Sequence, residues 1–549
     1  MNYNSTIDVY GAGKRAGVCI PVLKKYFRIN AIFDSSKEKV GSIYHGKSIL
    51  SPSDPMMGDN PIVVTVFDIS SVMQTLRNHG LTKNIYWCAS NSSRDLIIVE
   101  VEYDDSLLLK YDKIFKLSVN QEDPLLIKED SLEFQEGKPR IFNIASPSDF
   151  DGPGGPVACL RNMWLANLEY RMIDNLYTAC PAVVYVPKNG DGISNIEEAG
   201  IRTISIAKGL SEVMRKHSNS NDHLTFFLNI CRLAAFLEDL DRRFRFTNDD
   251  VFLLQDTFIL LAFMYQFPDL KRIATAYHGQ GTMSSELKKS NPHILDAIDD
   301  AQLLQLSKVK HWIFPSKGAS EGFLHTATPA MREAAKSCEF HVAYNGYEKK
   351  ELLSPDNDFV AFLDSVKADA IFASASFLYR NKGVERIPKI LAKFKSSTGI
   401  KIHWILVGGG EMEKEVEAAI EDNLEESDYT WFRERFANQD NIFALFSKAD
   451  FYIMMHRVSV FDLSTLQAMS YECVPFLSDV GGNKELCGFD NGLLCNPEES
   501  DLRLNRFMKD NRWDKTLLEI CKNNNATIIV DNFNNRKFLS GYYDVLRDL

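Results

Sequence analysis

The sequence has no closely spaced cysteine pairs. Its ten cysteines are scattered, without a CxxC motif or a His/Cys cluster at zinc spacing. This pattern is typical of free thiols in a reducing compartment and argues against a disulfide framework or a structural metal. The first residues, MNYNSTIDVYGAGKRAG, also lack the apolar core of a signal peptide. We therefore expect a cytoplasmic protein without a metal.

Long hydrophobic runs and an excess of basic residues are missing as well. The longest apolar candidate, residues 251–267, is interrupted by Gln255 and Asp256 and is shorter than the roughly 20 residues that a membrane-spanning helix needs. The formal net charge is -12, whereas binding to nucleic acid requires concentrated Lys and Arg. We expect no transmembrane anchor and no nucleic-acid partner.

The sequence is long enough for several domains and has the composition of an ordinary globular protein. Its 549 residues correspond to about three to four domains at roughly 150 residues each. With 45% hydrophobic and 25% charged residues, the composition is that of a globular protein with buried sheets.

The first 36 residues run in the order strand, glycine-rich turn, helix, strand, with the segments IDVYGAG, GKRAGVCIPVLKKY and INAIFDSS. This order is typical of a Rossmann-like unit, in which Gly11 and Gly13 would admit a phosphate and Asp34 would meet a ribose. The step from Gly13 to Gly17 departs from the dinucleotide fingerprint. A turn that only packs the helix on the strand is an equally good interpretation.

The alternation of short apolar strands and amphipathic helices restarts twice further along the chain. It predicts an α/β protein whose parallel sheets carry helices on both faces and leave a cleft between two tandem domains. We expect a Rossmann-like domain (1–120) followed by a charged linker (121–138). A second domain (139–350) and a third domain (351–535) come next, and a C-terminal helix (536–549) crosses back to the second domain.

Several motifs then occur in a fixed order: GPGG, YHGQG, FPSKGASEGF, YNGY, RNKG, LVGGGE and FDLSTLQAMSYECVPFLSDVGGNKEL. With these motifs, residues from about 140 to 549 resemble a GT-B glycosyltransferase, most closely the large retaining family numbered 4. The resemblance implies two Rossmann-like domains that face each other, a nucleotide-activated sugar held mainly by the C-terminal domain, an acceptor held mainly by the other, and no metal or other cofactor.

The resemblance assigns the charged diphosphate of the donor to Lys382, which stands beside Gly383 at a helix start. Without a metal, this charge must be stabilised by cations, backbone N–H groups and helix N-termini. The arginine that the family usually places shortly before this lysine is absent, and Arg380 and Arg457 are the candidate substitutes. His278 of YHGQG matches the family's histidine beside the transferred sugar.

Two glycines near the start of the second domain and two residues of the third domain complete the implied donor site. Gly154 and Gly155 follow the first strand of the second domain, Gly409 stands at a strand exit, and Glu485 of GGNKE lies where the family loop approaches the sugar. A tight strand-to-helix turn is an equal interpretation of the Gly409 motif.

Two acidic residues of the family's clamp are missing. The family has two glutamates separated by seven residues, and here those positions hold Ser459 and Gln467. Gln467 can still bind a ribose hydroxyl, but neutral hydrogen bonds have roughly half the strength of charge-assisted ones. Asp462 either reaches the sugar or caps the helix that begins near Ser464. The backbone around Leu463 and Ser464 is expected to face the diphosphate in either case.

The implied function is a retaining, metal-independent transfer of a hexose-type sugar from a nucleoside diphosphate to a glycan or lipid-linked acceptor, in bacterial surface polysaccharide synthesis, with peripheral contact to the inner face of the membrane. The alternative is a catalytically silent GT-B protein that binds a glycan, a polypeptide or an active transferase. The amino-terminal 120 residues resemble the nucleotide-binding domain of bacterial sugar acetyltransferases, without the hexapeptide repeats that follow there. A docking or regulatory module and a second catalytic site are equal interpretations of this domain.

Overall fold

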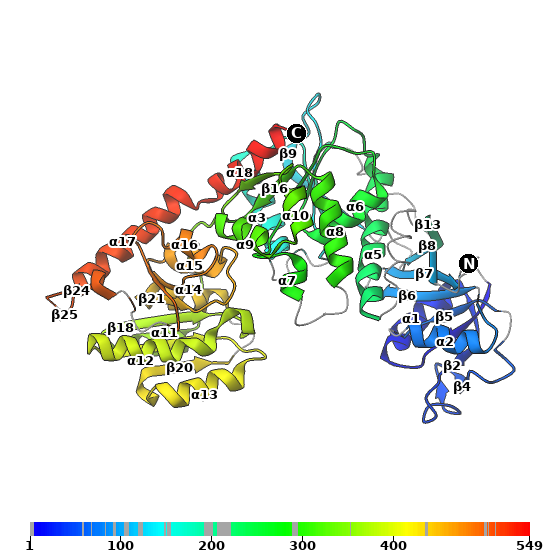
Figure 1. Ribbon diagram of the computed structural model, residues 1–549, viewed down its shortest axis with the longest axis horizontal. Helices are drawn as coiled ribbons and strands as arrows, with labels where there is room; N and C mark the ends of the chain where they lie inside the picture. Colours follow the sequence, from blue (N-terminus) through cyan, green and yellow to red (C-terminus); the bar gives the residue numbers. More distant parts are fainter. Residues whose placement is uncertain are drawn as a thin grey trace.

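The protein consists of three α/β units in a row, each built on its own sheet (Figure 1). The computed structural model describes residues 5–57, 60–66, 69–82, 84–91, 95–103, 109–118, 125–147, 150, 155–190, 201–205, 221–287, 295–351, 353–433, 438–498, 502, 504–510 and 512–549. Within them, no helix combines the length and hydropathy needed to cross a bilayer. All ten cysteines are free thiols.

The first sheet has the strand order β13-β8-β7-β6-β5-β1-β2-β4-β3. Its Rossmann-like half is parallel except for the antiparallel pair of β3 and β4, and its other half, from β6 to β13, is antiparallel. Helices α1 (Lys14–Tyr26) and α2 (Ile69–Asn78) belong to this unit. The strands are β1 (Thr6–Tyr10), β2 (Arg28–Phe33), β3 (Ile43–Tyr44), β4 (Lys47–Leu50), β5 (Ile62–Val64), β6 (Ile85–Asn91), β7 (Asp95–Tyr103), β8 (Leu109–Ser118) and β13 (Ile201–Ser205).

The second sheet has the order β17-β16-β15-β14-β10-β11-β12-β9. Its strands are β9 (Leu126–Glu133), β10 (Ile141–Ile144), β11 (Leu176–Cys180), β12 (Val183–Lys188), β14 (Val251–Leu254), β15 (Ile273–Ala276), β16 (His311–Phe314) and β17 (Glu339–Val342). Its helices are α3 (Gly155–Tyr170), α5 (Asn221–Phe244), α6 (Thr257–Gln266), α7 (Met283–Leu287), α8 (Leu295–Lys308), α9 (Lys317–Thr326) and α10 (Pro329–Ala335).

The third sheet is parallel throughout, with the order β20-β19-β18-β21-β22-β23. Its strands are β18 (Ala370–Ala375), β19 (Ile402–Val407), β20 (Tyr429–Phe432), β21 (Phe451–Met454), β22 (Val474–Ser478) and β23 (Leu493–Cys495). The helices are α11 (Asn357–Ser365), α12 (Ile387–Thr398), α13 (Glu413–Asn423), α14 (Gln439–Lys448), α15 (Leu463–Ser470), α16 (Asn483–Leu486), α17 (Lys515–Asn532) and α18 (Asn535–Arg547).

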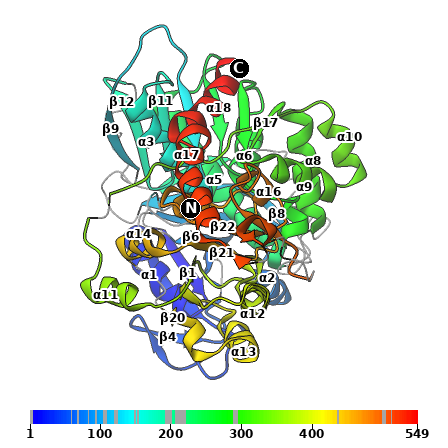
Figure 2. The ribbon, with the colours of Figure 1, turned by 90° about the vertical axis from the view of Figure 1, so that its left-hand side faces the viewer.

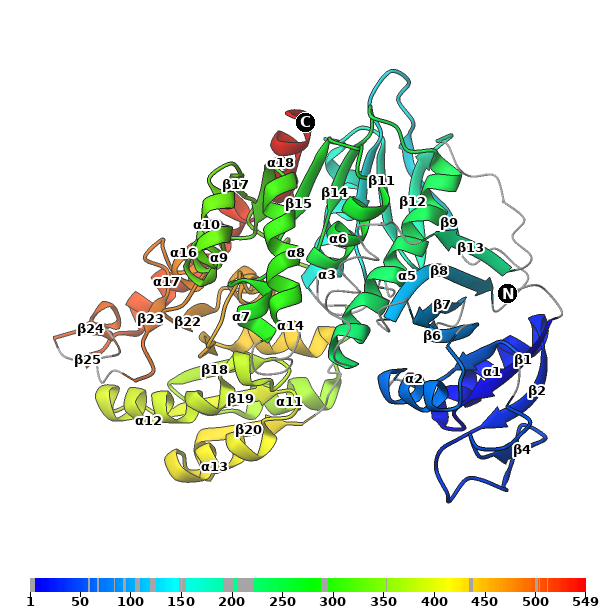
Figure 3. The same ribbon diagram turned by 45° about the vertical axis from the view of Figure 1, so that its right-hand side comes forward.

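The first two units share a hydrophobic core instead of being joined by a free linker. Trp87 of β6, Leu237 of α5 and Phe142 of β10 belong to one buried cluster. β13 comes from within the second unit of the chain but pairs with β8 of the first sheet, and the two strands lie side by side in Figure 3. The N-terminal unit is thus held to the second unit by packed side chains and by a shared strand.

The segment 121–138 also differs from the linker that its charge pattern predicts. Residues 126–133 form β9, which pairs in parallel with β12 at the edge of the second sheet. All of its side chains are exposed or half-buried. An edge strand with one solvated face carries many charged residues, and such a strand is easily mistaken for a linker.

The C-terminal helices connect the third unit to the second. α17 and α18 run one after the other, and Figure 2 shows them in red extending up to the second unit. Phe538, Leu539 and Tyr542 of α18 pack with Cys159 and Met163 of α3 in a buried cluster. These contacts lie on the second unit, which is where a helix crossing back from the third unit would dock.

Candidate active site

A cavity of about 570 Å³ lies between the second and third units, within the 300–1,000 Å³ typical of small-ligand sites. Both sheets contribute the carboxyl ends of their parallel strands, which is where ligands collect in open α/β sheets. The residues that line it are Ala158, His278, Glu286, Pro315, Asn345, Asn381, Lys382, His456, Val458, Ser459, Val460, Phe461, Asp462, Leu463 and Ser464.

Lys382 forms an ion pair with Asp462 at the third-unit side of the cavity. Lys382 Nζ lies 3.1 Å from Asp462 Oδ1, and the Asp462 side chain is only 9% exposed. Burial alone would raise the pKa of Asp462, but Lys382 and the nearby His456 hold that pKa well below its usual value. Asp462 is therefore a carboxylate, and it neutralises the cation expected to meet a diphosphate.

Asp462 also caps helix α15. Its Oδ2 accepts hydrogen bonds from Thr465 N and Thr465 Oγ1, both at 3.0 Å. A carboxylate at this position satisfies an unpaired N–H of the first turn and interacts favourably with the helix dipole. One of the two roles expected for Asp462, the helix cap, is thus present, and the pairing with Lys382 is an additional contact that the sequence did not reveal.

Gly383 lets the Lys382 segment approach strand β21. Its φ of +63° is in the left-handed region, and a Cβ there would overlap the Met455 carbonyl oxygen. Only glycine adopts this conformation without strain at such a close approach. In the NKG sequence, the glycine is therefore required for steric reasons, and the lysine supplies a positive charge.

His278 lies half-buried on the opposite side of the cavity. Its Nε2 is 3.0 Å from Gln255 Oε1, while Gln255 Nε2 donates to Asn143 Oδ1 at 2.7 Å. Because Gln255 presents an oxygen to the ring, Nε2 carries the proton and Nδ1 keeps a lone pair. Burial lowers the pKa of His278 to about 4, so that the imidazole is neutral near pH 7.

The replacements for the missing glutamates differ in what they contact. Ser459 is buried and lines the cavity, its N–H donates to Gln280 Oε1 at 2.7 Å, and its hydroxyl has no hydrogen-bond partner among the described residues. Gln467 is half-buried on α15, while Leu463 and Ser464 line the cavity.

Other expected donor residues lie elsewhere. The described cavity lining does not include Arg380, which is exposed, or Arg457, which is ion-paired with Glu385. Gly409 is also not part of this lining; its carbonyl accepts a hydrogen bond from Leu378 N at 3.1 Å. Gly155 begins α3, and Gly154 lies outside the described residues.

Glu485 makes contacts across the interface between the two units. Its carboxylate accepts hydrogen bonds from Lys317 N at 2.9 Å and Gly318 N at 2.8 Å, at the N-terminus of α9. Such charge-assisted bonds to a helix start are among the stronger hydrogen bonds in proteins. Gly318 packs so tightly that a Cβ on it would lie 2.6 Å from the Gly481 carbonyl oxygen.

Two titratable residues of the cavity were missed by sequence reasoning. His456 is buried and follows strand β21; its Nε2 lies 3.7 Å from Asp462 Oδ1, and its Nδ1 has no hydrogen-bond partner among the described residues. Glu286 accepts from Gln280 N at 2.9 Å, and burial raises its pKa. The position of His456 at a strand exit was a usable signal, whereas nothing in the sequence around Glu286 places it at the cavity.

The nucleotide-binding residues expected in the N-terminal unit, Gly11, Gly13 and Asp34, each form a hydrogen bond with a neighbouring residue of that unit. Asp34 Oδ2 accepts from Ala12 N at 2.8 Å, and Tyr44 donates to the Gly13 carbonyl at 2.8 Å. Gly11 has a φ of +104° and donates to the Phe33 carbonyl. Burial would raise the pKa of Asp34, but the N–H donors and Lys39 lower it. The carboxylate thus stabilises the glycine turn itself.

Comparison with known proteins agrees with this architecture. Residues 357–527 match the family model described as glycosyl transferases group 1. A trehalose-6-phosphate synthase from E. coli, bound with UDP-2-fluoro glucose, superposes with a TM-score of 0.53 at 13% identity over 74% of this chain and 99% of its own. A sucrose-phosphate synthase from Thermosynechococcus elongatus gives 0.51 at 14% identity over 74% and 98%.

An α,α-trehalose-phosphate synthase from Burkholderia xenovorans in complex with glucose-6-phosphate gives a TM-score of 0.50 at 13% identity, covering 74% of this chain and all of its own. No curated protein matches the chain in sequence. The second and third units thus have the GT-B fold, and the third unit is the part of the chain that matches the group 1 glycosyl transferase model.

Proposed function

We propose that the protein transfers a sugar from a nucleoside-diphosphate sugar to a glycan or lipid-linked acceptor, with the donor bound in the cavity between the second and third units. The observation that carries the proposal is the placement of Lys382 and the N-terminus of α15 at one cavity wall and of His278 at the other. A cation and a helix start are the groups that stabilise a leaving diphosphate without a metal.

The donor's diphosphate would lie beside Lys382, Leu463 and Ser464, and its sugar would point toward His278. The Nδ1 lone pair of neutral His278 can accept a hydrogen bond from a sugar hydroxyl. His456, whose Nε2 faces Asp462, offers Nδ1 as a further nitrogen in the same cavity. The acceptor would enter from the second unit, which supplies the opposite wall.

The reaction that we propose retains the configuration at the anomeric carbon. The bond from this carbon to the diphosphate breaks, the bond to the acceptor oxygen forms on the same face, and the acceptor proton passes to the leaving phosphate oxygen. The protein then needs no carboxylate nucleophile, in keeping with Ser459 and Gln467 at the clamp positions. Its contribution is to position the two substrates and to stabilise charge.

The biological setting is a further part of the proposal. By the resemblance to family 4 transferases, the acceptor belongs to a bacterial surface polysaccharide assembled at the cytoplasmic face of the membrane. The N-terminal unit, which resembles the nucleotide-binding domain of sugar acetyltransferases, would act as a docking or regulatory module.

A catalytically silent protein is the second candidate, and the pairing of Lys382 with Asp462 favours it. A buried carboxylate at 3.1 Å competes with a diphosphate for the same cation. In this case the cleft would serve to bind a glycan, a polypeptide or an active transferase rather than to catalyse a reaction.

Turnover of the donor distinguishes the two candidates. The full chain is incubated with UDP-, GDP-, ADP- and dTDP-sugars, with and without an acceptor glycan mixture, and release of the nucleoside diphosphate is measured. The enzyme is expected to release one nucleotide, at a rate lowered at least about tenfold in Lys382→Ala and His278→Gln and unchanged in the exposed control His325→Gln. Absence of nucleotide release from all four sugars, in wild type as in the variants, supports the silent candidate.

A further inference from the structure

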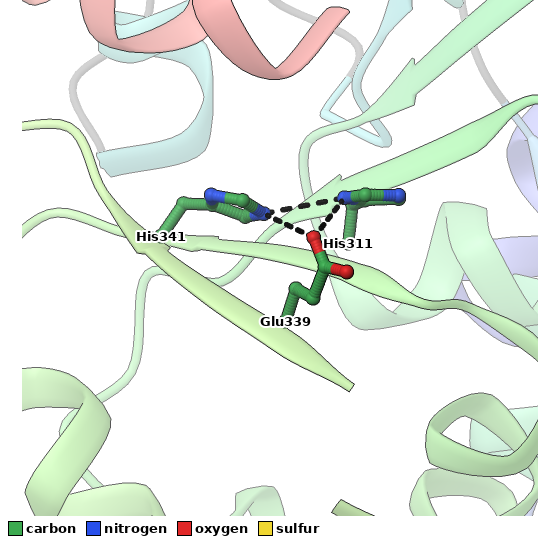
Figure 4. A group of neighbouring side chains, drawn as sticks. All are labelled: His311, Glu339 and His341. Atoms are coloured by element: carbon green, nitrogen blue, oxygen red, sulfur yellow. Dashed lines mark hydrogen bonds and ion pairs between the residues drawn. The ribbon is translucent and has the colours of Figure 1, made fainter. Parts of the chain in front are cut away.

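Two histidines and a glutamate meet at the edge of the second sheet, away from the cavity. β16 and β17 pair in parallel, with His311 opposite Glu339 and Ile313 opposite His341. His311 Nδ1 lies 3.2 Å from His341 Nε2 and 3.5 Å from Glu339 Oε2, and His341 Nε2 lies 3.9 Å from the same oxygen. Figure 4 shows the three side chains pointing toward one another.

The separations are those of ligands around one metal ion. Two nitrogens that bind zinc at about 2.0–2.1 Å with tetrahedral angles lie about 3.3 Å apart. The observed 3.2 and 3.5 Å are close to this separation, and the 3.9 Å contact needs only a small rotation of Glu339 or His341, whose side chains are 48% and 31% exposed. The three ligand atoms all lie within 4.8 Å of one another.

Lys310 orients the carboxylate for this role. Its Nζ lies 2.6 Å from Glu339 Oε1, which directs the other oxygen, Oε2, toward the two imidazoles. Partners that hold the outer atom of a ligand and fix its direction are a regular feature of metal sites. Because His341 and Glu339 are partly exposed, an ion can enter from solvent and keep water at its remaining position.

We infer that His311, Glu339 and His341 bind one divalent transition-metal ion of the zinc class. Two imidazoles, one carboxylate and a water are a donor set that suits zinc and cobalt. The ion is not placed to take part in sugar transfer, because His311 and Glu339 begin their strands, whereas the cavity lies at the opposite, carboxyl ends.

The ion would instead fasten the edge strand β17 to β16. β17 continues into Asn345, whose side-chain amide donates to the Phe461 carbonyl of the third unit at 3.1 Å. A metal at the beginning of β17 would hold the segment that carries this contact. The proposal stands on the three side chains alone and does not depend on the proposed function.

The test is a titration of the EDTA-treated, desalted full chain with Co²⁺, followed by competition with Zn²⁺. We expect one equivalent of Co²⁺ to bind with visible d–d absorption and no thiolate charge-transfer band, Zn²⁺ to displace it, and the melting temperature to rise. In His341→Gln and Glu339→Gln the affinity should fall at least about tenfold. The control His325→Gln, an exposed histidine on α9, should bind as the wild type does.

Two results would overturn the inference. One is the absence of saturable Co²⁺ binding to the wild-type chain. The other is equal binding by wild type, His341→Gln and Glu339→Gln, which would place the ion elsewhere. His341 is the preferred position for substitution because it is more exposed than His311, and circular dichroism without metal checks that each variant folds.

Discussion

Lys382 and Asp462 form an ion pair at the start of helix α15, with 3.1 Å between Nζ and Oδ1. The lysine is the group expected to meet the donor diphosphate. The same carboxylate caps α15 through Thr465. The Asp462 carboxylate therefore affects both the stability of α15 and the affinity of the site for an anion.

Asp462→Asn should tighten binding of the matching nucleoside diphosphate by about tenfold, since a carboxylate that competes for Lys382 and repels phosphate is removed. Asparagine still caps a helix, so α15 should remain intact. Calorimetric titration of wild type and variant measures the change. Weaker binding by the variant would mean that the carboxylate orients Lys382 for the phosphate instead of competing with it.

His278 should make the protein less stable as the pH falls. Its pKa is about 4 in the folded protein and about 6.5 when unfolded. Between these values the unfolded chain takes up a proton that the folded chain does not, so the free energy of unfolding decreases as the pH drops from 6.5 toward 4, by at most about 3 kcal/mol.

Denaturant midpoints at pH 7 and pH 5 test this expectation. His278→Gln should lose less stability between the two pH values than wild type does. His325→Gln, which changes an exposed histidine, should behave like wild type. Identical pH dependence in all three proteins would show that His278 titrates normally.

Gly318→Ala should separate the second and third units. The added methyl group would overlap the backbone of Gly481, which cannot move away as a flexible side chain could. The expected result is a larger radius of gyration in small-angle scattering and a melting temperature lowered by a few degrees, consistent with an overpacking cost of roughly 1–3 kcal/mol. Gly13→Ala is the control, because nothing lies within 4 Å of its Cβ position. Unchanged scattering for Gly318→Ala would contradict the close contact.

The α/β alternation and the GT-B architecture could be predicted from the sequence because parallel strands and their helices have strong periodic patterns. β9 could not, since its charged, half-exposed residues look like a linker. The pairing of β13 with β8 was equally hidden, because it joins strands separated by some eighty residues and depends on the shared core.

The site was predictable where a motif fixes the backbone. His278, Lys382, Asp462 and Ser464 come together at the cavity as their strand exits and helix start require. The positions of the other candidate residues depend on contacts with residues that are distant in the sequence. Arg457 is ion-paired with Glu385, and Glu485 binds the start of α9. Neither contact leaves a pattern in the sequence, since each depends on which side chains the fold brings together.

The most direct test of the central claim is an isothermal titration of the full chain with UDP, GDP, ADP and dTDP, repeated with Lys382→Ala. A nucleotide site in the cavity predicts saturable binding of one of the four and at least about tenfold weaker binding by the variant, the loss of one charge-assisted contact to phosphate. Binding that Lys382→Ala leaves unchanged, or no binding by any of the four, would contradict a donor site at Lys382 and α15.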